Sequence, residues 1–140
     1  MKRLLKMTFL GIVTFASVSN GAQKSALDAK TLFEQKCAMC HITKRPTPEM
    51  KKSLVAPPIM GVMHHIKDHG LDENEAVKFI TDYVLHPSKE KALCEAQGIE
   101  RFGLMPSQQG NVTEKELETI AHYIYRNFPP KGFRHRGMHK

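Results

Sequence analysis

Cys37, Cys40 and His41 are the residues whose types and spacing point most directly to chemistry. The segment from Cys37 to His41 reads Cys-Ala-Met-Cys-His, the C-x-x-C-H pattern of covalent c-type haem attachment. Two intervening residues on a helical turn let both thiols reach one porphyrin edge, where each adds to a vinyl group, and the histidine is then held under the iron as the proximal ligand. A zinc site would need a second ligand pair, and a thioredoxin-like redox pair would need strands; the sequence indicates neither.

The sixth iron ligand is expected well downstream of the attachment motif, and Met105 is the best candidate. Gly103 and Pro106 lie close to it on either side and favour an irregular loop, so the side chain can point at the iron instead of joining a helix face. A thioether is a soft donor that favours reduced iron and raises the potential. Met60 and Met63 are the nearest rivals, but they lie in a segment of helical apolar periodicity that suits a core role better.

The segment that leads into the motif resembles the N-terminal helix of class I, monohaem c-type cytochromes of the soluble, exported kind. Residues 32–37 read Leu-Phe-Glu-Gln-Lys-Cys, with Phe33 four residues before the first cysteine. The resemblance covers about residues 26–128. It implies an all-α, cytochrome c-like fold, with about four or five short helices wrapped around one haem c per chain.

The segment Ala56-Pro57-Pro58-Ile59-Met60-Gly61 resembles the Gly-Pro-x-Leu-x-Gly segment of the same family. Alanine stands in place of the first glycine here, and a second proline follows the first. In the family, the proline carbonyl accepts the Nδ1 hydrogen of the proximal histidine. The resemblance therefore implies a hydrogen bond between Pro57 and His41, which would fix the ring and raise its basicity.

The first 22 residues have the composition of an export signal. Lys2, Arg3 and Lys6 precede an almost uncharged apolar run at 7–18, and small residues follow up to Ala22, after which we expect cleavage. A membrane-spanning helix needs about 20 apolar residues, so a cleaved leader is favoured over an uncleaved anchor, which stays the alternative. We therefore expect a signal peptide at 1–22, a cytochrome c domain at 23–130, a basic and disordered tail at 131–140, and a periplasmic location.

Positive charge is concentrated at the two ends of the chain. The 140 residues include 21 Lys and Arg and 14 Asp and Glu, a formal net charge of +7. The cationic and anionic residues balance within residues 23–130, so the excess that remains after the leader lies in the tail. A nucleic-acid-binding face should be basic across a folded surface, which argues against that class of function. The tail could dock on an acidic partner or anionic lipid, or it could simply be a solubilising segment.

The apolar periodicity and the capping residues predict helices but no strands. Asp72 with Glu75, and Thr113 with Glu116, form capping boxes at the starts of two helices. A polar, proline-containing loop is expected over 42–58. The predicted helices cover 26–36, a stripe within 59–67, 72–85, a short piece at 88–96, and 113–128 up to the Pro129-Pro130 stop. In the family the last helix crosses the first, so we expect Ile120, Ala121 or Ile124 near Phe33.

Cys94 is a third thiol that the attachment motif does not use. It could be buried and inert, it could form an intermolecular disulfide, or it could ligate the iron as a thiolate. The last possibility would indicate an enzyme of sulfur chemistry.

Several other residues could bind iron, a metal ion or the haem propionates. His64, His86 and His122 are alternative sixth ligands. The histidine pairs 65/69 and 135/139 have a four-residue spacing that suits a metal site on a helix, although a solvated face explains them as well. The candidates for contacts with the propionates are Lys44, Arg45 and Arg101.

The sequence therefore predicts a periplasmic one-electron carrier, not an enzyme, with a haem c attached through Cys37 and Cys40 and ligated by His41 and Met105. It would shuttle electrons between respiratory redox complexes, as a monomer with redox protein partners. Two alternatives remain open. One is a haem enzyme or gas-binding protein with a labile sixth ligand; the other is a haem subunit docked on a larger redox enzyme through the basic tail.

Overall fold

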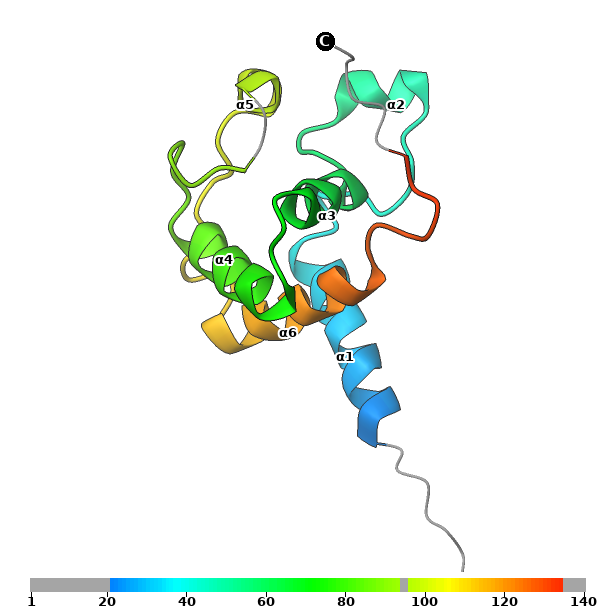
Figure 1. The fold of residues 1–140 in the computed structure, drawn as a ribbon, viewed down its shortest axis with the longest axis vertical. Helices are drawn as coiled ribbons and strands as arrows, with labels where there is room; N and C mark the ends of the chain where they lie inside the picture. Colours follow the sequence, from blue (N-terminus) through cyan, green and yellow to red (C-terminus); the bar gives the residue numbers. More distant parts are fainter. Residues whose placement is uncertain (1–20, 94–95, 135–140) are drawn as a thin grey trace, which may run out of the picture.

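Helix α6 (Glu114–Asn127) is the element against which most of the fold packs in the computed structural model, which describes residues 21–93 and 96–134. Helices α1 (Gly21–Lys36), α3 (Ile59–Asp68) and α4 (Glu73–Leu85) all contact it. Figure 1 shows α6 running below α4 and crossing α1 at one end of the molecule. The buried residues of α6 recur at helical spacing and are Leu117, Ile120, Ala121 and Ile124.

The core joins α1, α3, α4 and α6 in one apolar cluster. Phe33 of α1 is only 1% exposed, and its ring lies 6.0 Å from that of Tyr123 and 6.1 Å from that of Phe128. Ile120, Ala121 and Ile124 belong to the same cluster, as the predicted crossing of the first and last helices requires. Met63 of α3 is completely buried there, which confirms its predicted core role.

Both predicted capping boxes are present. At α4, the Glu75 amide donates to Asp72 Oδ1 at 2.9 Å and the Asp72 amide donates to Glu75 Oε2 at 3.0 Å. At α6, the Glu116 amide donates to Thr113 Oγ1 at 3.2 Å and the Thr113 amide donates to Glu116 Oε2 at 2.8 Å. Each box satisfies two amides that the first turn of a helix leaves without a partner, so these helices begin where their sequences specify.

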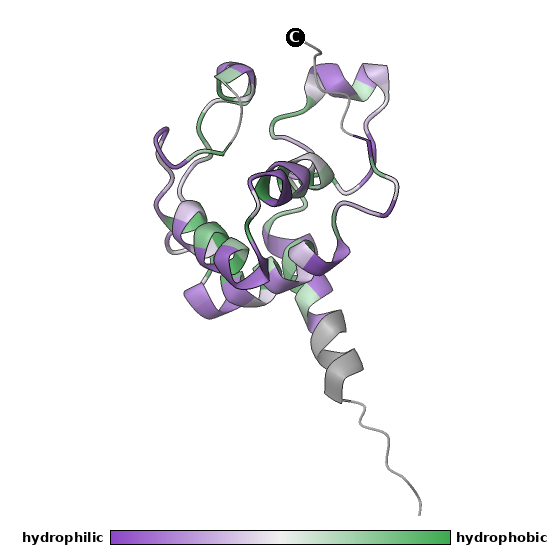
Figure 2. Ribbon diagram, viewed as in Figure 1, coloured by the Kyte–Doolittle hydropathy of each residue, from purple (hydrophilic) through white to green (hydrophobic). Residues whose placement is uncertain are grey.

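The described residues are all-helical, which confirms the predicted fold class, but they contain six helices instead of four or five. The additional helix, α2 (Pro48–Ser53), lies within the segment 42–58 that was predicted as a loop. Thr47 caps it by accepting from the Met50 amide at 3.3 Å, and proline occupies its first turn. Helix α2 buries no side chain, and Figure 2 shows it as mostly hydrophilic, so no apolar periodicity could have revealed it.

The prediction of a helix at 88–96 is wrong. Residues 88–93 are not helical and contain a turn at 89–91, and the helix of this region is α5 (Ala96–Phe102), displaced toward the C-terminus. Lys91 extends back to α4, where its ammonium lies 2.6 Å from Asp82 Oδ2, and its amide donates to Ser88 Oγ at 3.4 Å. These contacts favour a turn beside α4 over a continuing helix. The first helix also differs from its prediction, since α1 begins at Gly21 and not near residue 26.

The predictions for both ends of the chain fall largely outside the described residues, as does Cys94. These comprise the leader over residues 1–20 and the tail over 135–140, which includes its histidine pair. The first part of the tail is described and folds back: Phe133 lies 5.8 Å from the His64 ring, and Arg45 donates to the Arg134 carbonyl at 3.1 Å. In the part of the chain that the structure covers, no helix is long and apolar enough to cross a membrane.

We expect Thr113→Ala to lower the free energy of unfolding by about 1 kcal/mol, because it removes the side-chain cap of the helix at the centre of the packing. Thr119→Ala, within the same helix, is the matched control. The Thr119 hydroxyl only bonds back to the Lys115 carbonyl at 2.9 Å, so its loss should change stability by less than about 0.5 kcal/mol. Urea unfolding of both variants with haem attached measures the difference, and equal effects would contradict the role assigned to the cap.

Candidate functional site

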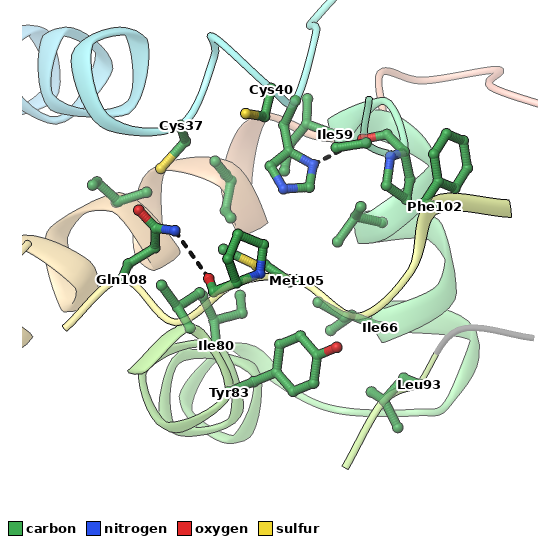
Figure 3. A pocket seen from close by; sticks show the side chains of 18 of the residues that line it. Cys37, Cys40, Ile59, Ile66, Ile80, Tyr83, Leu93, Phe102, Met105 and Gln108 are labelled. Atoms are coloured by element: carbon green, nitrogen blue, oxygen red, sulfur yellow. Dashed lines mark hydrogen bonds between the residues drawn. The ribbon is translucent and has the colours of Figure 1, made fainter. Parts of the chain in front are cut away.

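An apolar cavity of about 380 Å³ lies among α3, α4, α5 and α6 and the turn that follows α1. Its wall is largely aliphatic and aromatic, which suits a flat apolar ligand held by a few polar groups. Figure 3 shows Cys37 and Cys40 on one side of the cavity, Met105 in its middle, and Tyr83 and Leu93 on the other side. Representative lining residues are Ile59, Ile66, Phe79, Ile80, Ile99 and Phe102.

The Cys-x-x-Cys-His segment continues from α1 as a hydrogen-bonded turn. The Cys37 amide donates to the Phe33 carbonyl at 2.9 Å, and the amides of Cys40 and His41 donate to the Cys37 carbonyl at 3.1 and 2.9 Å. All three motif residues line the cavity as a result. Both cysteines are free thiols. The turn therefore presents two thiols and an imidazole to the same space, as attachment at one porphyrin edge requires.

The imidazole of His41 is oriented by a backbone carbonyl. Its Nδ1 lies 2.8 Å from the carbonyl oxygen of Pro57, the pair that the family resemblance implied. With Nδ1 donating to that oxygen, Nε2 is the nitrogen left to act as a ligand. Burial lowers the pKa of His41, and the bond to Pro57 only partly opposes that shift. The net lowering of the pKa favours the neutral, singly protonated ring, which is the form that binds a metal.

Burial also acts on the first cysteine of the motif. It raises the pKa of the Cys37 thiol to about 11, with a smaller contribution from the neighbouring Cys40. Cys37 is therefore a neutral thiol near pH 7. A neutral sulfur at the cavity wall is compatible with the apolar lining around it, whereas a thiolate there would lack solvation.

The loop that carries Met105 begins at a glycine and is held against the end of α4. Gly103 has a positive φ of 72°, and its amide closes α5 by donating to the Ile99 carbonyl at 2.8 Å. After Met105, Ser107 Oγ donates to the Leu85 carbonyl at 2.6 Å, and the Gln108 amide donates to the Val84 carbonyl at 3.0 Å. The last carbonyls of a helix lack partners within it, so the loop satisfies α4 while α4 fixes the loop.

The structure brings the five predicted site residues together: Cys37, Cys40, His41, Pro57 and Met105 all line the same cavity. The rival sixth ligands lie elsewhere, since neither Met60 nor Met63 lines it, and neither do the three candidate histidines. Among those, His122 Nδ1 lies 2.6 Å from Glu73 Oε1, and His86 Nδ1 lies 3.2 Å from Gln109 Nε2.

The polar residues of the cavity wall that the sequence analysis did not place there include His65 and Gln108. Gln108 holds the methionine loop through a second contact, in which its side-chain amide donates to the Pro106 carbonyl at 2.9 Å (Figure 3). Nothing in the sequence indicated this contact. His65 could have been found from its position in α3, because it follows Val62 by three residues and precedes Ile66, and both of those line the cavity.

The candidates for propionate contacts have other partners in this structure. Arg45 bonds to the tail, and Arg101 donates from Nη2 to the Lys51 carbonyl. Neither lines the cavity, and neither does Lys44, whereas Lys36 does, with its ammonium 2.9 Å from the Asn111 carbonyl. Over residues 21–93 and 96–134, no three His, Cys, Asp or Glu side chains gather as a site for a separate metal ion.

The residues present fit a covalently attached haem. Two free thiols, a neutral imidazole with its Nδ1 already bonded, and a thioether share one apolar cavity. The two thiols suit attachment to the vinyl groups of a haem, and the imidazole and the methionine sulfur suit the two protein ligands of its iron. The apolar wall suits the macrocycle.

Comparison with known proteins gave one family and one relative. The model of the family described as "Cytochrome C oxidase, cbb3-type, subunit III" matches residues 24–124. An uncharacterized protein of Aquifex aeolicus (strain VF5) is 31% identical over 140 residues, which cover 91% of this chain and 89% of the relative. No solved structure matches significantly.

We expect Ser107→Ala to loosen the methionine loop, because it removes the hydroxyl that donates to Leu85 and accepts from the Gln109 amide at 3.2 Å. The loss should be about 1 kcal/mol of unfolding free energy, together with faster hydrogen exchange at the Gln109 amide. Ser53→Ala is the matched control, since the Ser53 hydroxyl bonds only within α2, to the Met50 carbonyl at 3.1 Å. Unchanged exchange at Gln109 would show that the hydroxyl does not hold the loop.

Proposed function

Because this chain belongs to the cytochrome c family described as cytochrome c oxidase, cbb3-type, subunit III, whose members carry covalently bound haem c, we propose that it is a one-electron carrier working in the periplasm. It would accept one electron from a reduced donor protein and pass it to an oxidised acceptor, so that no bond forms or breaks. The observation that carries the proposal is the convergence of Cys37, Cys40, His41 and Met105 on one apolar cavity.

Each of the four residues has a distinct role in this proposal. Cys37 and Cys40 hold the macrocycle through thioether bonds, which the free thiols of the turn can form. His41 would bind the iron through Nε2 while Pro57 holds its Nδ1, and Met105 would supply the second protein ligand. When bound, haem c supplies a one-electron ferrous–ferric couple.

The surroundings of these residues suit electron transfer without further chemistry. With His41 and Met105 both serving as iron ligands, no position would be open for a substrate, and a donor set that suits both oxidation states would keep reorganisation small. The apolar wall excludes water and disfavours the extra charge of the ferric state, as a thioether ligand also does. These factors favour a positive potential for the couple.

The leader and the charge distribution of the sequence support a proposal for the location and the partners. We propose that residues 1–22 direct export and are removed, and that donor and acceptor meet the protein in brief encounters over small interfaces. The balanced charge of residues 23–130 supports partner recognition that does not depend on a single strongly basic face.

A second candidate is a haem subunit that stays docked on a larger redox enzyme. The description of the family, which names an oxidase subunit, favours it. The basic tail over 131–140 offers a charged contact for such an assembly, and Lys131 and Arg134 are exposed in its described part. The chemistry at the cavity would be the same in both cases, and only the lifetime of the complex would differ.

Met105→Ala should abolish the weak red charge-transfer band of the ferric protein, because that band reports a methionine sulfur on the iron. The ferrous variant should then bind carbon monoxide readily, whereas the wild type should not. Met60→Leu is the matched control: Met60 is buried outside the cavity and the exchange conserves volume, so the band should persist. A wild type without the band that binds carbon monoxide would instead indicate a ligand-binding protein or enzyme.

Native electrophoresis distinguishes a diffusing carrier from a docked subunit. Cells of the source organism are mildly solubilised, and the gel is stained for haem and probed for this chain. A diffusing carrier should migrate as a free protein of about the size of the chain. Comigration with a large oxidase complex would establish the docked subunit. Replacing Lys131, Arg134, Arg136 and Lys140 with Gln should then release the chain from the complex, while Lys78→Gln on α4, the control, should not.

A further inference from the structure

Arg101 connects two short helices that come from distant parts of the sequence. From α5, its Nη2 donates to the carbonyl of Lys51 in the last turn of α2. That carbonyl has no partner within its helix, and the C-terminal end of a helix carries partial negative charge. A guanidinium is therefore a suitable partner for this end of α2.

Both helices are close in sequence to residues of the cavity wall. In the sequence, α2 lies between His41 and Pro57, and Val55, two residues after its end, lines the cavity. Helix α5 ends three residues before Met105, and its last residue, Phe102, lines the cavity and lies 4.8 Å from the Arg101 guanidinium. Figure 1 shows α2 and α5 at the same end of the molecule.

Neither helix is fixed by burial. No residue of α2 is buried, and none of α5 is, in contrast to α3, α4 and α6. Surface contacts such as the one that Arg101 makes therefore contribute to their positions, in addition to the cavity-lining side chains Ile99 and Phe102 of α5. The far end of the methionine loop has its own attachment, through Ser107 and Gln108 to α4. The near end of the loop depends on α5.

We propose that Arg101 is a positioning residue for Met105, a latch that holds α5 against α2 and thereby limits how often the methionine leaves the iron. This inference rests on the proposed function, because it takes Met105 as the sixth ligand. For Met105 to leave, the segment 103–106 must move outward, and α5 must yield with it. Without the latch, that opening would no longer have to break the hydrogen bond between Arg101 and Lys51, so opened states would be more populated.

The test measures the binding of imidazole to the ferric protein at concentrations where release of Met105 limits the rate. We expect Arg101→Met to raise that limiting rate about threefold to tenfold, as for the loss of one exposed, charge-assisted hydrogen bond. Arg101→Lys keeps the charge but has a single donor group, so its limiting rate should fall between those of the wild type and Arg101→Met. The control is Lys78→Met, an equal loss of charge at an exposed position of α4, which should leave the rate unchanged.

Hydrogen exchange at the amides of residues 99–103 provides a second readout. Faster exchange there together with faster imidazole binding in Arg101→Met would support the latch. Faster exchange with an unchanged binding rate would overturn it, since the contact would then hold α5 without holding Met105. No change in either quantity would overturn it as well. The red band of the wild type is recorded first: if it is absent, the proposed ligation fails, and the latch is overturned with it for that separate and identifiable reason.

Discussion

The packing of Phe33 against α6 is the contact on which the attachment site depends. Its side chain is almost completely buried beside Tyr123 and Phe128, and its backbone carbonyl accepts the Cys37 amide that starts the motif turn. One residue thus fixes both the crossing of α1 with α6 and the place where the thiols begin. The capping box of α6 sets the start of the helix that this ring packs on, so a local signal at Thr113 determines a contact at the other end of the chain.

The two sides of the cavity are stabilised in different ways. The thiols and the imidazole follow a helix anchored in the core, and a shift there would expose apolar area, at about 25 cal/mol for each Å². Met105 instead lies on a loop held by hydrogen bonds from Ser107 and Gln108 to the end of α4. Each such bond contributes only about 1 kcal/mol, so the methionine side can open at a cost far below that of unfolding. In the proposed site, the covalent bonds to the haem lie on the packed side, and the weaker bond from the Met105 sulfur to the iron lies on the side that opens more easily.

The sequence predicted the elements that have local signals and missed those that depend on distant contacts. The boxes at Asp72 and Thr113 could be read from four-residue patterns, and the stripe of α6 from its periodicity, because both are properties of one helix. Helix α2 has no apolar stripe and was missed. The segment 88–93 was predicted as helix because its contact between Lys91 and Asp82 of α4 depends on the fold. The site residues were brought together as expected, but Gln108, which also lines the cavity, had no motif to indicate it, and His65 was noted only for its spacing from His69.

The double proline at positions 57 and 58, where the sequence departs from the family pattern, explains how His41 obtains its partner. A residue that precedes proline is disfavoured from helical conformation, so Pro57 cannot become part of α3. Its carbonyl is then free of helix bonds and available to the imidazole, 2.8 Å away. The carbonyl of Pro58, by contrast, starts α3 by accepting the Gly61 amide at 2.9 Å, and the Ile59 amide bonds to the Ile42 carbonyl at 3.0 Å beside the motif. The second proline therefore separates the helix from the carbonyl that orients the histidine, and it preserves the contact that the family's glycine-containing segment makes.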